Sequence, residues 1–149
     1  MSKETIPTSP RQTQGSCLCG KVAYEITGEP LGVAACHCTN CKKASGAPFM
    51  WNVILLRNQF RMVSGEDVVK SFDDIGTGSG NTSHRSFCSN CGSSVFINND
   101  GRPEWTIVMT GCMKDVPAEW SPKMELYCKY KAKWLPDVEG VKRFTEGLP

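Results

Sequence analysis

Cysteine content is the feature that most constrains this chain, because nine of its 149 residues are cysteine. Seven of them fall into three short spaced sets, whereas Cys112 and Cys128 stand alone. The first residues, MSKETIPTSPRQTQ, lack the apolar segment of an export signal, so we expect a reducing compartment in which disulfides are uncommon. The odd count and the clustering therefore favour metal binding over disulfides.

The spacing within the three sets is typical of zinc sites. The sets are C-x-C at Cys17 and Cys19, C-H-C-x-x-C at Cys36, Cys38 and Cys41, and C-x-x-C at Cys88 and Cys91. Both thiolates of a C-x-x-C turn face one ion. A following glycine such as Gly92 relieves the backbone strain of the turn. Because zinc takes four ligands, seven cysteines divide into one closed site and one site with a vacant position. Spacing leaves the partition open, since a ribbon of the two C-x-x-C pairs is also plausible.

The rest of the sequence predicts many short strands and few helices, which indicates an all-β domain. We expect strands over residues 21–27, 51–56, 60–62, 68–72, 94–97, 105–109 and 123–130. One short helix is expected over residues 40–44, ended by Gly46, and a second over residues 138–145. The glycine-rich segment 76–81 is interpreted as a flexible connector, because it lacks the lysine of a phosphate-binding loop.

Composition and charge fit one domain with a small-molecule partner. We expect a mobile lead-in over residues 1–14 and a single domain over residues 15–149. A formal charge of +2 gives no general attraction for nucleic acid or an anionic membrane. The sequence contains no run of eighteen uncharged apolar residues that would predict a membrane span, so we expect a cytoplasmic protein.

Three segments carry a resemblance to a known family. GSCLCGKVAYEITGEP, ACHCTNCKKASGAPF and RSFCSNCGSSVF, in this order, resemble the glutathione-dependent formaldehyde-activating enzyme family. The resemblance implies an all-β, zinc-stapled domain of the β-tent type with one or two short helices. It also implies two zinc ions per chain: a structural one on Cys17, Cys19, Cys88 and Cys91, and a catalytic one on Cys36, Cys38 and Cys41.

The implied activity follows from the vacant position of the three-cysteine site. A substrate thiol that binds there would lose its proton and remain nucleophilic. We therefore expect a carbon–sulfur lyase or synthase that acts on an adduct of glutathione or a related thiol, such as S-hydroxymethylglutathione. A lyase for other glutathione or cysteine conjugates in a biosynthetic pathway is an alternative.

Residues near the triplet are candidates for substrate contact. These candidates are Lys42, Ser45, Phe49, Trp51 and Arg85. With Lys43, the basic ones could offset the negative charge of the site or meet glutathione carboxylates, but exposed basic residues more often belong to the solvated surface. Phe49 and Trp51 fit the protein core as well as a substrate cleft.

Four further residues have a structural interpretation. We expect His37 to lie beside the metal rather than on it, and His84 to be an ordinary loop histidine. Cys112 and Cys128 are expected to be small buried apolar side chains. If His37, one of these cysteines or a neighbouring chain supplied an eighth ligand, both zinc sites would be structural.

A non-catalytic binding module is the alternative from another class, because the segments also resemble the centromere protein V domain. Such a module favours a long basic arm, but the first 14 residues contain only Lys3 and Arg11. Lys129, Lys131 and Lys133 alternate, a pattern that also fits the solvent face of an edge strand.

Overall fold

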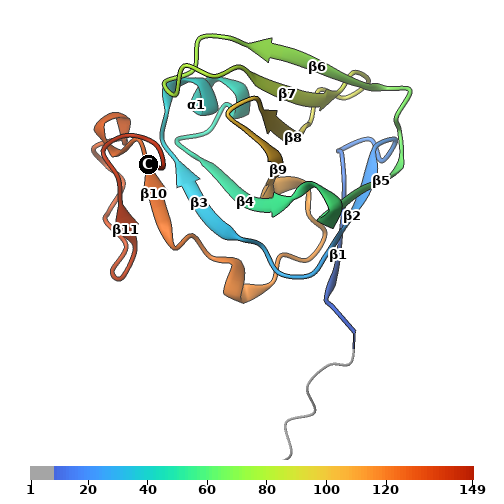
Figure 1. Cartoon of the computed structure of the whole chain (residues 1–149), viewed down its shortest axis with the longest axis horizontal. Coiled ribbons are helices and arrows are strands. Elements are labelled where there is room, and N and C mark those ends of the chain that lie inside the picture. Colours follow the sequence, from blue (N-terminus) through green and yellow to red (C-terminus); the bar gives the residue numbers. More distant parts are fainter. Residues whose placement is uncertain (1–8) are drawn as a thin grey trace, which may run out of the picture.

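Two β-sheets and one α-helix make up the chain, which this computed structural model describes over residues 9–149 (Figure 1). The all-β prediction is confirmed, with α1 (Thr39–Ser45) as the α-helix of the described residues. Residues 1–8 of the expected lead-in lie outside the described residues. Residues 12–14 differ from the prediction, because β1 (Gln12–Ser16) starts three residues before the expected domain boundary.

The smaller sheet is antiparallel and has the order β1-β2-β5, with β2 (Ala23–Thr27) in the middle and β5 (Phe60–Ser64) at one edge. Tyr24 and Ile26 alternate with half-buried neighbours along β2, which is the expected period of two. Gly15 on β1 lies opposite Tyr24. A Cβ at Gly15 would be 2.2 Å from Cζ of Tyr24, so the aromatic ring requires glycine there.

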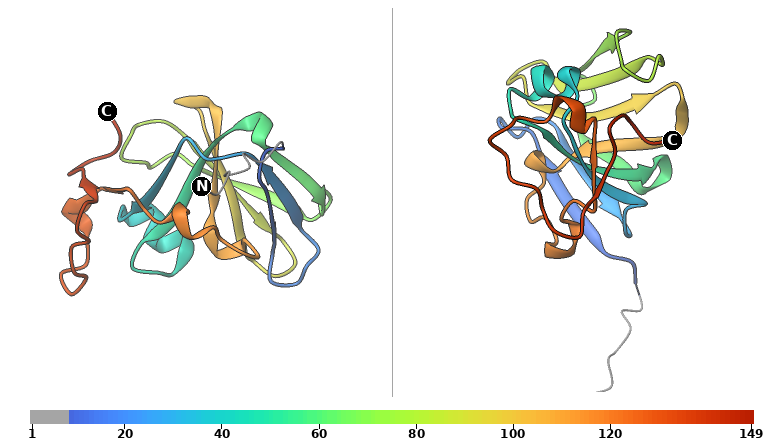
Figure 2. Two further views of the ribbon diagram at one scale, coloured as in Figure 1. Left: turned by 90° about the horizontal axis from the view of Figure 1, so that it is seen from below. Right: turned by 90° about the vertical axis from the view of Figure 1, so that its left-hand side faces the viewer.

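The larger sheet has eight strands in the order β11-β10-β3-β4-β9-β8-β7-β6 (Figures 1 and 2). Its neighbouring strands are antiparallel, except that β10 pairs in parallel with both β3 and β11. The strands are β3 (Gly32–Cys36), β4 (Met50–Leu56), β6 (Val69–Asp74), β7 (Ser83–Cys88), β8 (Ser94–Asn99), β9 (Arg102–Met109), β10 (Met124–Leu126) and β11 (Lys142–Arg143).

The two faces of the central strands contact different parts of the molecule. On one face, Val53 and Leu55 of β4 pack with Tyr24 and Ile26 of the smaller sheet in the main core. Because side chains alternate along a strand, Asn52 and Ile54 point to the other face, where they line a cavity. The sequence of β4 is almost wholly apolar because both of its faces are covered.

Short 3-10 helices connect several strands: η1 (Arg57–Gln59), η2 (Thr110–Cys112), η3 (Ala118–Trp120) and η4 (Cys128–Tyr130). The predicted strand over residues 123–130 is therefore too long. It ends at Leu126, since Tyr127 takes the left-handed conformation at φ 55° and η4 follows. No helix among residues 9–149 is long and apolar enough to cross a membrane.

The helix predicted over residues 138–145 is wrong. The segment holds β11, which pairs with β10, and Gly140 lies at φ 78°, a conformation that interrupts a helix. Its spaced apolar residues instead face a surface cavity, which Val138 and Val141 line.

Candidate metal centres and cleft

The four-cysteine cluster joins the two sheets. Cys17 and Cys19 lie in the turn after β1 of the smaller sheet, whereas Cys88 ends β7 of the larger sheet and Cys91 follows in the next turn. The four Sγ atoms lie within 4.8 Å of one another. Sγ of Cys19 is 3.5 Å from that of Cys17 and 3.8 Å from that of Cys88. Since a Zn–S bond of about 2.3 Å places tetrahedral sulfurs about 3.8 Å apart, this donor set fits zinc.

Backbone turns hold these sulfurs in place. The amide of Val22 donates to Sγ of Cys17 at 3.3 Å, and the amide of Gly92 donates to the carbonyl of Cys88 at 2.7 Å. Gly92 has φ 80°, which confirms the reason for a glycine directly after the C-x-x-C turn. The hydroxyl of Ser93 accepts from the amide of Leu18 at 3.0 Å and so fastens one cysteine turn to the other.

The three-cysteine cluster, formed by Cys36, Cys38 and Cys41, is built from one strand end and the first turn of α1. Cys36 is the last residue of β3, and Cys38 is the N-cap of α1. The amide of Cys41 donates to Sγ of Cys38 at 3.2 Å, which turns these two sulfurs toward the same point. All three Sγ atoms lie within 4.8 Å of one another, and among the described residues neither His37, Cys112 nor Cys128 belongs to the group.

The sulfurs of the triplet shift one another's pKa in opposite directions. The hydrogen bond from Cys36, and then that from Cys41, lowers the pKa of the Cys38 thiol. The same contact with Cys38 raises the pKa of Cys36 far above its ordinary value. One thiolate therefore forms readily and a second does not, whereas a divalent cation favours the ionised form of all three.

Arg85 on β7 brings positive charge to this cluster. Its Nη1 is 3.8 Å from Sγ of Cys41, and its Nε donates to Asp74 at 2.8 Å. Asn40 of α1 donates to both oxygens of Asp74 at 2.9 Å. Burial alone would raise the pKa of Asp74, but the hydrogen bonds from Asn40 and Arg85 outweigh it and lower that pKa. The carboxylate thus fixes Arg85 against the sulfurs and fixes α1 against β7.

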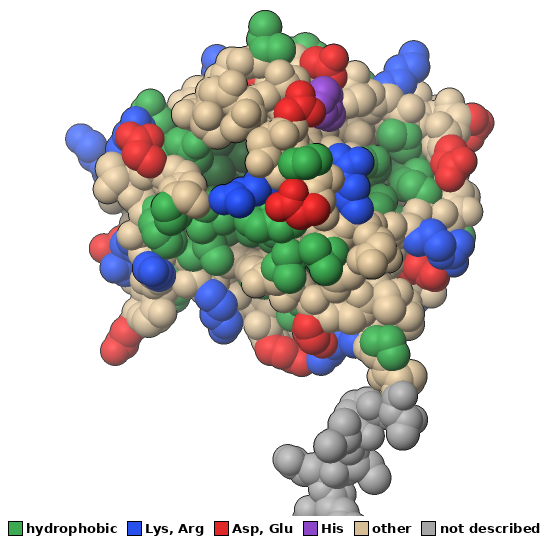
Figure 3. Space-filling view, viewed as in Figure 1, with side chains coloured by type: hydrophobic (Ala, Val, Ile, Leu, Met, Phe, Trp, Pro, Cys, Tyr) green, Lys and Arg blue, Asp and Glu red, His purple; other side chains and the backbone are tan. Residues whose placement is uncertain are grey.

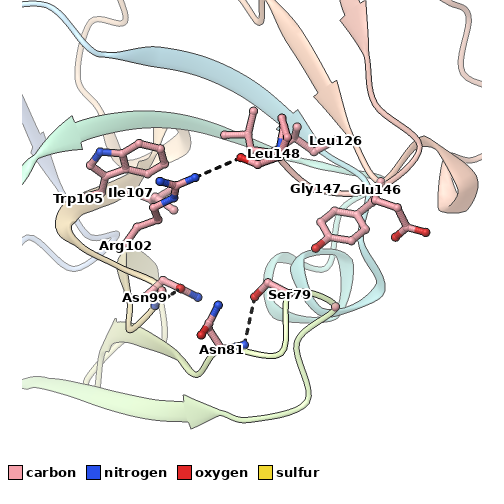
Figure 4. Close-up of a pocket in the computed structure, with 14 residues that line it drawn as sticks. Ser79, Asn81, Asn99, Arg102, Trp105, Ile107, Leu126, Glu146, Gly147 and Leu148 are labelled. Carbon is pink, nitrogen blue, oxygen red and sulfur yellow. Dashed lines mark hydrogen bonds between the residues drawn. The ribbon is translucent and has the colours of Figure 1, made fainter.

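The triplet borders a cavity of about 160 Å³ that adjoins a wider cleft of about 820 Å³. Seven residues line both spaces: Gly78, Ser79, Trp105, Ile107, Leu126, Tyr127 and Leu148. In Figure 4 the wider cleft is surrounded by the end of the β8–β9 hairpin, the loop of Ser79 and Asn81, and the segment of Glu146 to Leu148. Figure 3 shows apolar side chains gathered in a hollow of this face between charged side chains.

Tyr127 joins two chain segments at the cleft. A Cβ on Gly78 would lie 2.9 Å from Cε1 of its ring, and a Cβ on Gly147 would lie 2.9 Å from its hydroxyl. The ring therefore fits between two glycines, one in the loop before β7 and one after β11. Segment 76–81, expected to be a connector only, is in fact a wall of the cleft through Gly78 and Ser79.

Of the predicted substrate-contacting residues, the structure places Arg85 alone in the cavity beside the triplet. The Lys42 ammonium donates to the carbonyl of Tyr130 at 2.8 Å, and the Ser45 hydroxyl donates to the carbonyl of Cys41 at 2.8 Å. The Trp51 indole donates to the carbonyl of Trp120 at 3.0 Å, and Phe49 packs against the ring of His37. These four follow the triplet in sequence, but α1, β4 and the connection between them place their side chains outside the cavity.

His37 lies on the far side of the sheet from the triplet's cavity. It is 1% exposed, and its Nε2 is 3.0 Å from Oε1 of Glu125 on β10. Lys131 and Arg143 also contact the Glu125 carboxylate, at 3.0 and 3.3 Å. His37 thus fixes the chain between two cysteines of the triplet to the neighbouring strand, in agreement with its expected structural place.

The remaining candidates lie apart from both clusters. His84 bridges Asp73 and Asp100, with its two ring nitrogens each 2.7 Å from a carboxylate oxygen. Cys112 and Cys128 are half-buried rather than buried, and each Sγ donates to a backbone carbonyl. Lys129 and Lys131 do not lie on an edge strand; they form ion pairs with Glu146 and with Glu125.

Comparison with known proteins agrees with this arrangement. The sequence model of the glutathione-dependent formaldehyde-activating enzyme family matches residues 12–130, which include both cysteine clusters. The chain belongs to this family. The crystal structure of a Rhodobacter sphaeroides protein is similar to this glutathione-dependent formaldehyde-activating family member, with a TM-score of 0.56, 24% identity and coverage of 71% of this chain and 92% of that one. That likeness concerns the fold, and no curated protein matches the chain.

Sequence reasoning missed several residues of the cavity and the cleft in this family member. Asn52 lines the cavity, Arg102 lines the cleft, and Ser79, Trp105 and Tyr127 line both; none lies in a cysteine motif. Asn52 could have been singled out from the sequence, because it is a single amide side chain within the otherwise apolar run WNVILL. The others come from segments that only the pairing of distant strands brings together.

Proposed function

We propose that both clusters bind zinc and that the chain is a zinc-dependent carbon–sulfur lyase or synthase for a glutathione adduct of formaldehyde. Family membership supports the glutathione and formaldehyde chemistry. The observation that carries the proposal is the three-sulfur cluster at the wall of a cavity, beside Arg85. Four sulfurs complete a tetrahedral site, whereas three leave a position for a substrate sulfur.

The two clusters would hold two ions with different tasks. Cys17, Cys19, Cys88 and Cys91 would hold the structural ion that joins the sheets, and Cys36, Cys38 and Cys41 would hold the ion at the cavity. When bound there, zinc supplies an acceptor for a sulfur ligand and lowers the pKa of a thiol.

The chain's own residues define where the reaction takes place. Arg85 offsets the negative charge that gathers when a further thiolate comes close to Cys41. The apolar wall of Ile54 and Ile107 limits water near the sulfur. In the synthetic direction the thiolate sulfur forms a bond with the carbonyl carbon, the carbonyl π electrons move to oxygen, and that oxygen takes a proton. The lyase direction reverses each step.

The wider cleft suits the body of a polar thiol. It adjoins the cavity and carries hydrogen-bonding side chains, among them Asn81, Asn99 and Arg102. A tripeptide thiol has two carboxylates and two peptide groups, which need such partners when they leave water. Glutathione can thus extend along the cleft while its sulfur enters the cavity.

Exchange NMR tests the proposal. The interconversion of glutathione and S-hydroxymethylglutathione is measured with zinc-loaded protein and with a Cys38→Ser variant, in which serine still caps α1. We expect faster exchange with the wild type and the uncatalysed rate with the variant. Absence of acceleration by wild-type protein with two bound zinc ions would reject formaldehyde as substrate, and other glutathione or cysteine conjugates would then be assayed.

A further inference from the structure

Asn52 is a buried amide without a partner at the cavity of the triplet. Its side chain lies on β4, is 7% exposed, and lines the same cavity as Cys36, Cys38 and Cys41. Its Oδ1 finds no hydrogen-bond partner among residues 9–149. Buried polar atoms are almost always hydrogen-bonded, so an unpaired one at a cavity wall points to a ligand that completes it.

The side chains around Asn52 in the cavity are mostly apolar, which makes an amide unusual there. β4 pairs Asn52 with Ala34 of β3 and with Met109 of β9, so its side chain stands in the middle of the sheet face that bears Cys36. Ile54, Ile107 and Leu126 supply apolar surface to the same cavity. An apolar side chain would fit such a wall without the cost of an unpaired amide.

We propose that Asn52 selects adducts with a hydroxyl on the carbon bonded to sulfur, by accepting a hydrogen bond from that hydroxyl. This inference rests on the proposed function, because it places the substrate sulfur at the triplet. A hydroxymethyl adduct satisfies Oδ1, whereas an alkyl thioether of the same shape leaves it buried and unpaired. Sites that hydrogen-bond a substrate hydroxyl discriminate strongly against analogues without one.

The same side chain suits both sides of the reaction. An asparagine amide has an acceptor oxygen and two N–H donors. Oδ1 accepts from the hydroxyl of the adduct, and the amide group can donate to the carbonyl oxygen of the free aldehyde. Asn52 transfers no proton itself. As the carbon–sulfur bond breaks, the electrons of that bond go to sulfur, the electrons of the O–H bond form the carbonyl π bond, and the hydroxyl proton goes to solvent.

Binding of two isosteric ligands tests this selection. S-hydroxymethylglutathione, generated from glutathione with excess formaldehyde, is compared with S-ethylglutathione, in which a methyl group replaces the hydroxyl. We expect wild-type protein to bind the hydroxymethyl adduct at least about tenfold more tightly. Asn52→Leu, which has a similar volume and no polar atoms, should lose this preference, keep both zinc ions and melt at a higher temperature.

Thr106→Val is the matched control. Thr106 is a buried polar residue of the same sheet, but its hydroxyl donates to Asn98 and it does not line the cavity. This variant should keep the ligand preference within about twofold. A second readout is the side-chain amide signal of Asn52 in a ¹⁵N spectrum, identified by its loss in Asn52→Leu, which should move with the hydroxymethyl adduct and not with the ethyl thioether.

The outcomes separate this inference from the function on which it rests. If wild type binds glutathione and its adduct but Asn52→Leu keeps the preference, the role of Asn52 is overturned and the proposed function stands. If wild type with two zinc ions binds neither glutathione nor its adduct, the proposed function fails and the inference with it.

Discussion

The two cysteine clusters use the same ligand atom in different surroundings. The four-cysteine cluster draws its members from both sheets and fits a closed tetrahedron, with Sγ atoms 3.5 and 3.8 Å apart. The three-cysteine cluster draws its members from β3 and α1 and borders a cavity with Arg85 and Asn52. The donor atom is therefore the same in both clusters, and they differ in the number of sulfurs and in the space beside them. This difference is the basis of the proposed structural and catalytic roles.

Removing one cysteine from each cluster gives the largest expected contrast. Cys88→Ser should prevent stable folding, because structural zinc contributes on the order of ten kcal/mol, comparable with the roughly 5–15 kcal/mol stability of a whole domain. Cys38→Ser should leave the fold intact and lose one zinc ion per chain. Circular dichroism and metal analysis check both, with Cys112→Ser, outside both clusters, as the control. A folded Cys88→Ser protein would contradict the assignment.

Chelation sharpens the same comparison without mutation. A zinc chelator added stepwise should remove the ion of the three-cysteine cluster first, because an ion with three protein ligands is held less firmly than one with four. Tertiary structure should persist after the first ion and be lost with the second. A zinc-sensitive dye and near-ultraviolet circular dichroism follow the two steps; simultaneous loss of metal and structure at the first step would count against separate roles.

Arg85 tests how far the surroundings of the triplet contribute to stability. Arg85→Gln should cost about 3 kcal/mol in free energy of unfolding, because it leaves the mostly buried Asp74 carboxylate without its cation. The matched variant Arg61→Gln breaks an exposed pair with Glu25 and should cost less than about 1 kcal/mol. Urea unfolding measures both. Equal costs would mean that the Arg85–Asp74 pair is no more than a surface contact.

His84, which belongs to neither cluster, should give the smallest effect. Hydrogen bonds to the carboxylate of Asp73, and then to that of Asp100, raise its pKa above the ordinary 6.5. The folded protein therefore holds this proton more tightly, so the contribution is complete below the ordinary pKa and is lost as pH rises through the raised one. Thermal melts across neutral pH should show a small fall in wild type and a flatter profile in His84→Gln. If the melting temperature of His84→Gln fell with pH as steeply as that of wild type, His84 would not be the source of the fall.

The parts of the molecule governed by local pattern could be predicted from sequence. The alternation of Val22, Tyr24 and Ile26 predicts β2, and Gly46 at φ 66° ends α1 as expected. The seven clustered cysteines form the two groups that the family resemblance implies. The first two features depend on residues a few positions apart. The division of the cysteines into two groups came from the family resemblance, because their spacing alone left it open.

Features set by distant pairing could not be predicted in this way. β7 carries polar residues, SHRSFC, and β1 reads QTQGS, so neither shows the apolar period of a strand. Both become strands because their neighbours supply backbone partners and the cysteine turns fix their ends. Asn52 was missed for a different reason. The sequence predicts a strand that contains Asn52, but it does not reveal that the sheet face on which Asn52 lies borders the triplet.

The parallel pairing of β10 with β3 has a consequence for the order of folding. Cys36 lies beside Leu126 in this pair, and Leu126 also forms part of the cavity wall. Contacts between residues so far apart in sequence form late, because the chain between them must first be closed. The three cysteines of the triplet are also synthesised long before Leu126, which covers part of their cavity. Until that contact forms, their sulfurs are open to oxidation. A nascent chain that binds zinc early would be protected, which links metal supply to the yield of folded protein.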